Sequence, residues 1–254
     1  MRKLVVLGGV AVAAAVAAAF AVAGGGHAAS RLGLAAAVSK TEATPSVRYT
    51  IHVRLRHAGM PMALHIHGQA AAHTISVAMR MSDLTLADGT VVPGPTGAAL
   101  LDGPFLYERA PSNLAVDGPV RWQRLTVWTL PAGSGDLAAI RSMSPAPLLR
   151  LLRAAHTGRA SQTSRIVRGS IAYDDLAVRR LTRLIGHLEF RHLRVFAGLG
   201  RDKRVHRIVL TGRTADGRTT LSLRARLFGY GKPFHVTPPK PSTFVDQQLA
   251  QIAA

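Results

Sequence analysis

Three histidines come closest to forming a metal site in this sequence. His65 and His67 lie two positions apart in an alternating segment, so both share one strand face, and His52 is expected on a neighbouring strand. Two imidazoles so placed are able to bind zinc or copper. All three nevertheless occupy the polar phase of their segments, and the sequence offers no nearby carboxylate to orient them. A solvated strand face is the preferred interpretation, and no metal or other cofactor is expected.

Catalysis by a nucleophile or by an acid and a base lacks suitable residues. The sequence contains no cysteine and no Gly-x-Ser-x-Gly segment, and its glutamates are Glu42, Glu108 and Glu189. No carboxylate pair is placed for the general acid and base of a glycosidase. The glycine-rich segment 198–200 runs into charged residues and resembles a turn rather than a nucleotide-binding loop. We therefore expect a protein that is not an enzyme.

The charge is strongly positive, at +19, with 32 lysines and arginines against 13 acidic residues. Such a field attracts polyanions, including nucleic acids, anionic lipid headgroups and acidic wall polymers. Charge spread over solvated strand faces, with no specific partner, is the alternative that the sequence leaves open. The arginines that fall on expected strand faces are Arg48, Arg54, Arg191, Arg194, Arg204, Arg207, Arg213, Arg224 and Arg226.

Residues 1–29 have the features of an export signal. Arg2 and Lys3 precede an uncharged apolar run over 4–23, and small residues at 21–23 and 26–28 suit a signal peptidase. The run is also about 20 residues long, which is enough to span a bilayer if uncleaved. Its Ala/Gly richness favours cleavage. We expect an extracytoplasmic envelope protein, secreted or anchored by its leader, and export argues against nucleic acid as its partner.

Residues 30–254 are predicted to form one domain dominated by antiparallel strands. Four Asp-Gly pairs are strong turn signals, because both residues tolerate a positive φ, and segment 87–97 is predicted to be a loop. The pairs are at 88–89, 102–103, 117–118 and 216–217. Alternating or short apolar segments predict strands at 47–55, 64–67, 75–81, 99–101, 105–107, 121–130, 165–173, 189–197, 204–213 and 219–228.

Helices are expected at fewer places. Pro45 ends the first, and Pro147 suits the first turn of another. The predicted helices span 31–44, 137–143, 148–155 and 176–185, with a closing helix over 243–254 after an extended tail. About ten or eleven strands and two or three covering helices must bury their apolar faces against each other. A strongly curled antiparallel sheet covered by helices, an α+β half-barrel, does this and encloses an apolar cleft.

Three motifs follow one another along the mature chain. They are Lys40-Thr41-Glu42-Ala43-Thr44-Pro45-Ser46-Val47-Arg48-Tyr49, then Gly103-Pro104-Phe105-Leu106-Tyr107 with Trp122, and finally Leu227-Phe228-Gly229-Tyr230-Gly231-Lys232-Pro233-Phe234-His235-Val236-Thr237-Pro238-Pro239. Together they resemble the actinobacterial envelope proteins of the LppX/LprG type, relatives of the LolA/LolB lipoprotein carriers. The resemblance implies a LolA-like half-barrel whose interior receives the acyl chains of lipids, glycolipids or lipidated proteins. Many members carry a lipid-modified cysteine after the leader, which this chain lacks.

An apolar pocket of this kind has candidate lining residues, although each could equally belong to an ordinary core. They are Met79, Met81, Leu84, Leu100, Phe105, Tyr107, Leu148, Leu151, Leu152 and Phe190. The first hypothesis is a monomeric protein that binds a lipid or another lipophilic ligand in an open cavity. Arginines near its mouth would pair with anionic headgroups, and a membrane surface is a further expected partner. The alternative is a membrane-anchored sensor or regulator, with a filled core and an exposed apolar patch for a protein partner.

Overall fold

The computed structural model describes residues 32–71, 73–85, 89–109, 122–126, 143–157, 166–172 and 190–246. The strands are β1 (Ser46–His57), β2 (Met60–Ala71), β3 (Thr74–Met81), β4 (Leu84–Thr85), β5 (Val91–Val92), β6 (Thr96–Asp102), β7 (Phe105–Arg109), β8 (Trp122–Thr126), β9 (His156–Thr157), β10 (Ile166–Ala172), β11 (Phe190–Leu199), β12 (Val205–Thr214), β13 (Thr219–Phe228) and β14 (Phe244–Asp246). The helices are α2 (Leu32–Glu42), α4 (Ala146–Ala154) and the 3-10 turn η4 (Pro241–Thr243).

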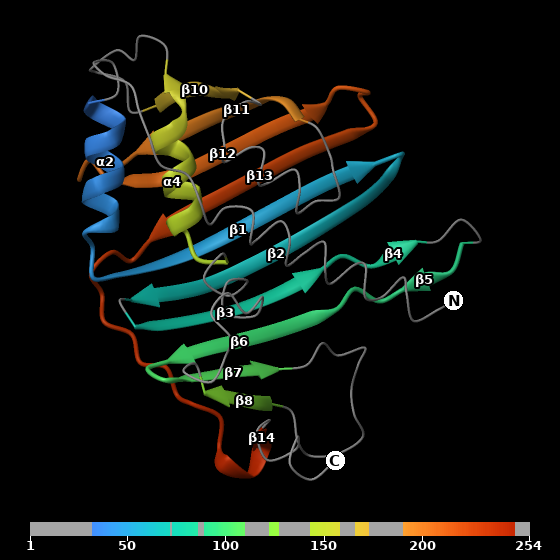
Figure 1. The fold of residues 1–254 in the computed structure, drawn as a ribbon, viewed down its shortest axis with the longest axis vertical. Coiled ribbons are helices and arrows are strands. Elements are labelled where there is room, and N and C mark those ends of the chain that lie inside the picture. Colours follow the sequence, from blue (N-terminus) through green and yellow to red (C-terminus); the bar gives the residue numbers. More distant parts are fainter. Residues whose placement is uncertain are drawn as a thin grey trace.

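Most of these strands belong to one open sheet of 12 strands (Figure 1). Its order is β14-β8-β7-β6-β3-β2-β1-β13-β12-β11-β10-β9, and β4 and β5 form a separate pair. Neighbours in the large sheet are antiparallel, except that β14 runs parallel to β8. The predicted α+β class, a large antiparallel sheet with covering helices, is confirmed.

Several predicted elements differ from the observed ones. The predicted loop 87–97 contains β5 and the first residues of β6, and the predicted closing helix begins instead with η4 and β14. The leader, the predicted helices at 137–143 and 176–185 and the Asp-Gly pair at 117–118 lie outside the described residues, apart from Met143 in a turn. No helix in the described ranges is long and apolar enough to cross a membrane.

Alternation along each strand gives the sheet two chemically different faces. We call the inner face the one on which α2 and α4 lie, and the outer face the opposite one (Figure 1). Strand β1 shows the pattern clearly, because Ile51, Val53 and Leu55 are buried on the inner face while the residues between them are exposed. Strand β13 repeats this pattern in register with β1. Along β1 and β13, the apolar core therefore lies on one side of the sheet.

Two separate clusters make up that core. In the larger one, α2 and α4 pack on β1, β2 and β10–β13, and the leucines of α4 face the sheet at helical spacing. The smaller one consists of Ile75, Leu101 and Leu106, which lie on the inner faces of β3, β6 and β7. Neither α2 nor α4 lies over β7 and β8 (Figure 1). The described helices thus cover one half of the inner face only.

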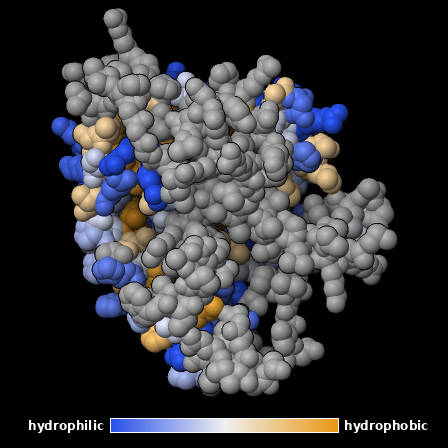
Figure 2. Space-filling model, in the orientation of Figure 1, coloured by the Kyte–Doolittle hydropathy of each residue, from blue (hydrophilic) through white to orange (hydrophobic). Residues whose placement is uncertain are grey.

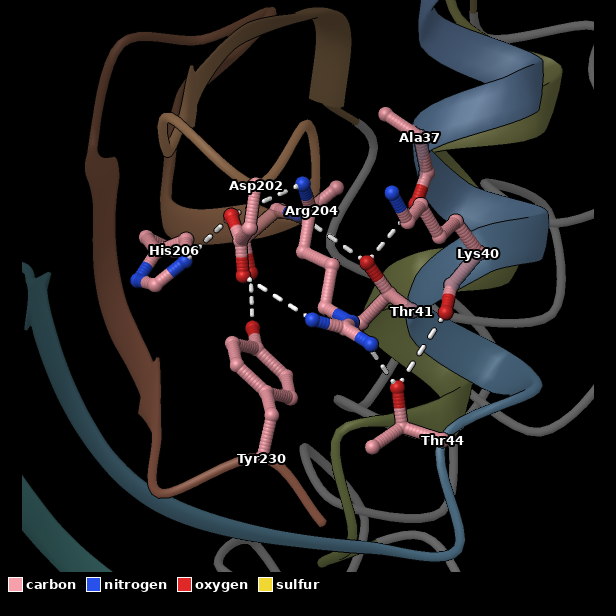
Figure 3. A network of polar contacts seen from close by, with 9 residues as sticks. Ala37, Lys40, Thr41, Thr44, Asp202, Arg204, His206 and Tyr230 are labelled. Atoms are coloured by element: carbon pink, nitrogen blue, oxygen red, sulfur yellow. Dashed lines mark hydrogen bonds and ion pairs between the residues drawn. The ribbon is translucent and has the colours of Figure 1, made fainter.

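A buried threonine ties α2 to the turn between β11 and β12 (Figure 3). The Thr41 hydroxyl donates to the Ala37 carbonyl at 2.7 Å and accepts from the Val205 amide at 2.9 Å. Beside it, the Nε of Arg204 donates to the Thr44 hydroxyl at 3.2 Å. A buried amide left without a partner costs about 1–3 kcal/mol, so Thr41 fixes the end of α2 on the sheet.

The same turn holds a small ionic network (Figure 3). Asp202 lies 3.2 Å from the guanidinium of Arg204 and 3.0 Å from a ring nitrogen of His206. Partial burial acts to raise the pKa of Asp202, but hydrogen bonds from Arg204 and His206 outweigh it and hold the pKa below its usual value. The Tyr230 hydroxyl donates to the Val205 carbonyl, which brings the C-terminal segment to this network.

Candidate functional site

The first and last sequence motifs meet at one end of the sheet and have a structural role. The Ser46 hydroxyl donates to the Lys232 carbonyl at 2.8 Å, and the Gly231 amide donates to the Ser46 carbonyl at 2.9 Å. With Thr41 and Tyr230, these contacts join α2, β1 and the segment after β13. The first and the last of the three motifs therefore hold the helix α2 and the sheet together.

A row of small and apolar residues crosses the middle of the inner face. Tyr49 on β1 pairs with Gly68 on β2, Gly68 with Val77 on β3, and Val77 with Ala99 on β6. Ala99 is half-buried and packs against both clusters, so the row joins the half covered by the helices to the other half. Gly68 and Ala99 in this row have small side chains, so they project little from the inner face.

Two predicted pocket residues lie beside this row. Met79 and Met81 are half-buried on the inner face of β3 and pack against the larger cluster. Gly97 on β6 is opposite Met79, and a Cβ atom at Gly97 would lie 2.8 Å from the Met79 methyl carbon. The glycine thus makes room for a flexible side chain that adapts to neighbouring groups. In the view of Figure 2, hydrophobic side chains appear on this face between hydrophilic ones.

The predicted pocket residues do not all meet. Six are on the inner side: Met79, Met81, Leu148, Leu151, Leu152 and Phe190, of which the last four are at most 3% exposed. Leu84 belongs to β4, which is outside the large sheet. Leu100, Phe105 and Tyr107 correct the prediction, because the register places them on the outer face. Leu101 and Leu106 are the inner-face residues of β6 and β7.

The outer face is strongly basic. Strands β1, β2 and β10–β13 contain no acidic residue in their described ranges. Twelve arginines of the described strands point outward by register: Arg48, Arg54, Arg56, Arg80, Arg109, Arg124, Arg168, Arg194, Arg207, Arg213, Arg224 and Arg226. Arg204 belongs instead to the ionic network, and the Arg191 side chain lies outside the described set. The sheet separates these twelve arginines from the inner face, so the pairing of arginines near the mouth of the pocket with anionic headgroups stays a prediction.

A groove of 630 Å³ runs across this basic face. Its lining includes His52, Arg54, Arg207, Arg224, Arg226 and Phe228. His52 and His65 are paired, as expected, with ring centroids 4.5 Å apart. Partial burial and the positive charges of His65, Arg54 and Arg224 lower the pKa of His52. Because four arginines line it, the groove suits anions rather than a cation. No cluster of three metal-ligating side chains occurs in the described part of the chain.

Tyr49 is not among the residues that the sequence predicts to line the pocket. It is 1% exposed on the inner face, and its hydroxyl has no hydrogen-bond partner in the described structure. Burial raises the pKa of this hydroxyl above its ordinary value, so it stays protonated. The available signal was its place in the inward phase of the first strand, opposite a glycine.

No family model matches the chain, and no curated protein matches it. The chain is similar to the solved structure of LprF from Mycobacterium bovis, with a TM-score of 0.44, 13% identity and coverage of 84% of this chain and 96% of LprF. Lipoprotein LppX from Mycobacterium tuberculosis has a TM-score of 0.38, 15% identity and coverage of 80% and 98%.

A third similar structure is a putative outer membrane lipoprotein-sorting protein domain from Vibrio parahaemolyticus. Its TM-score is 0.31, its identity is 8%, and the coverage is 82% of this chain and 95% of that chain.

Proposed function

We propose that this protein binds a lipid, or another lipophilic molecule with long acyl chains, on the inner face of its sheet, without catalysing a reaction. The observation that carries the proposal is the half of the inner face at β3, β6, β7 and β8. Its inward side chains include the buried apolar residues Ile75, Leu101 and Leu106, with small and adaptable side chains such as Ala99 and Met79 beside them, and neither described helix lies over β7 and β8. Glu108, which pairs with Ala99, is a charged residue at the edge of this apolar area. Apolar surface of this kind is stabilised by burial against hydrocarbon.

We further propose that the outer face docks the protein on a membrane that contains anionic headgroups. Twelve arginines of the described strands project from this face, and the strands that carry most of them have no acidic residue. Each basic residue near an anionic membrane contributes about 1 kcal/mol to binding. In this proposal, the inner face holds the apolar ligand and the outer face binds the anionic membrane surface. The leader-like residues 1–29 support an extracytoplasmic location for this activity.

Native mass spectrometry of the purified protein, before and after removal of bound lipid, tests the proposed function. We expect an adduct of defined mass that organic extraction identifies as an acylated lipid, and that returns when the stripped protein is incubated with envelope lipids. An unchanged apo mass under both conditions would overturn the proposal. That result would favour the alternative of a sensor or regulator with a filled core.

A further inference from the structure

The hydroxyl of Tyr49 lies above the backbone of the neighbouring strand. A Cβ atom built on Gly68 would be 2.5 Å from the hydroxyl oxygen and 2.6 Å from the ring carbon that bears it. The ring of Tyr49 therefore crosses β2 on the inner face and directs its hydroxyl away from β13, toward β3. Gly68 is needed for space here, because alanine would collide with the ring and with the Ser76 carbonyl at 2.6 Å.

This buried hydroxyl is unusual because nothing in the described structure accepts its proton. Native proteins pair most buried polar groups, so an unpaired one calls for an explanation. Tyrosine is retained at a position where phenylalanine would fill the same space without this penalty. The raised pKa keeps the group in its donor form. The hydroxyl is thus a fixed donor without an acceptor inside the apolar core.

The surroundings of the hydroxyl restrict the chemistry of that acceptor. Beyond Gly68, the same row continues with the apolar residues Val77 and Ala99 and then with Glu108 on β7. Every arginine of β1 and β3 points to the outer face. A neutral acceptor such as a carbonyl oxygen suits this environment better than a phosphate or a carboxylate, because a buried anion needs a cationic partner.

We propose that the Tyr49 hydroxyl donates a hydrogen bond to an ester or amide carbonyl of an acylated lipid bound on the inner face. This inference rests on the proposed function. Each acyl chain begins at one carbonyl and is otherwise apolar, which matches a single donor beside an apolar row. The hydrogen bond positions the ligand along the row and distinguishes acyl chains from alkyl chains. Tyr49 is therefore a specificity-determining residue for the binding site.

A double comparison of protein and ligand tests this role. Wild type and Tyr49→Phe, both stripped of lipid, are titrated with diacyl phosphatidylglycerol and with its diether counterpart of the same chains and headgroup. The diether lacks the carbonyl oxygens. We expect wild type to prefer the diacyl lipid about tenfold, and Tyr49→Phe to bind both lipids about equally, at the weaker affinity. Thermal unfolding without lipid should show Tyr49→Phe to be at least as stable as wild type.

The possible outcomes separate this inference from the proposed function. If wild type binds neither lipid, the proposed function itself fails. If both proteins bind the two lipids with unchanged preference, lipid binding stands and the role of Tyr49 is wrong. Loss of stability in Tyr49→Phe without any change in ligand preference would show that the hydroxyl is paired within the protein or with water, and would also overturn the inference.

Discussion

Replacing Ala99 with tryptophan should abolish lipid binding while leaving the protein folded. Ala99 lies on the inner face of β6, in the row that joins the two apolar clusters. A tryptophan side chain there would occupy the space above Val77 that an acyl chain needs. In a filled core, such an insertion costs about 1–3 kcal/mol. We expect a smaller change in the free energy of unfolding and no lipid adduct in native mass spectrometry.

Ala98 gives the matched control for this substitution. It is the preceding residue on β6, pairs with Ala78 and Arg109, and points to the outer face. Ala98→Trp adds the same side chain on the other side of the sheet and should retain the lipid. If Ala99→Trp binds lipid as well as Ala98→Trp does, the ligand is not on the inner face.

Removing three arginines from the outer groove should reduce binding to anionic membranes about a hundredfold. The variant is Arg54→Gln/Arg224→Gln/Arg226→Gln, whose three side chains line the groove together. At about 1 kcal/mol for each charge, the loss is about 3 kcal/mol, which corresponds to this factor. Cosedimentation with phosphatidylcholine vesicles, with and without phosphatidylglycerol, measures it. The effect should disappear at high salt, because exposed charges are screened.

A control with the same loss of charge separates the groove from net charge. Arg201, Arg218 and Lys240 are exposed residues in turns and in the C-terminal segment. Replacing all three with glutamine should reduce vesicle binding by less than about tenfold, since these residues are off the outer face. Equal losses for the two triple variants would mean that total charge, rather than this face, attracts the protein to membranes.

The fold class could be predicted because the strands on either side of β1 alternate cleanly. In β13, the inward residues Leu221, Leu223 and Ala225 are each followed by an outward polar residue, so both the strand and its buried face follow from the sequence. The turn between β1 and β2 gave a weaker signal. It has two residues, Ala58 with φ +49° and Gly59 with φ +87°, and alanine rarely adopts this conformation. The Asp-Gly rule therefore did not find it.

The candidate site was harder to predict, because β6 and β7, which form part of it, do not alternate. Leu100 and Leu101 are adjacent, and Phe105, Leu106 and Tyr107 are consecutive, so hydrophobicity alone does not show which face each residue occupies. The pairing register between strands decides which face each residue occupies, and this register depends on strands that are distant in the sequence. The outward phase of many arginines was visible in the sequence. Their separation from the apolar face required the position of the helices.

The central claim is that acyl chains lie on the inner face of β3, β6 and β7. Photo-cross-linking tests it most directly, with a phosphatidylglycerol that carries a diazirine within one acyl chain, followed by peptide mapping of the adducts. We predict light-dependent adducts on inner-face residues such as Val77, Met79 and Ala99, competed by unlabelled lipid. Adducts confined to outer-face residues such as Ala98 and Leu100, or no competition by unlabelled lipid, would contradict the claim.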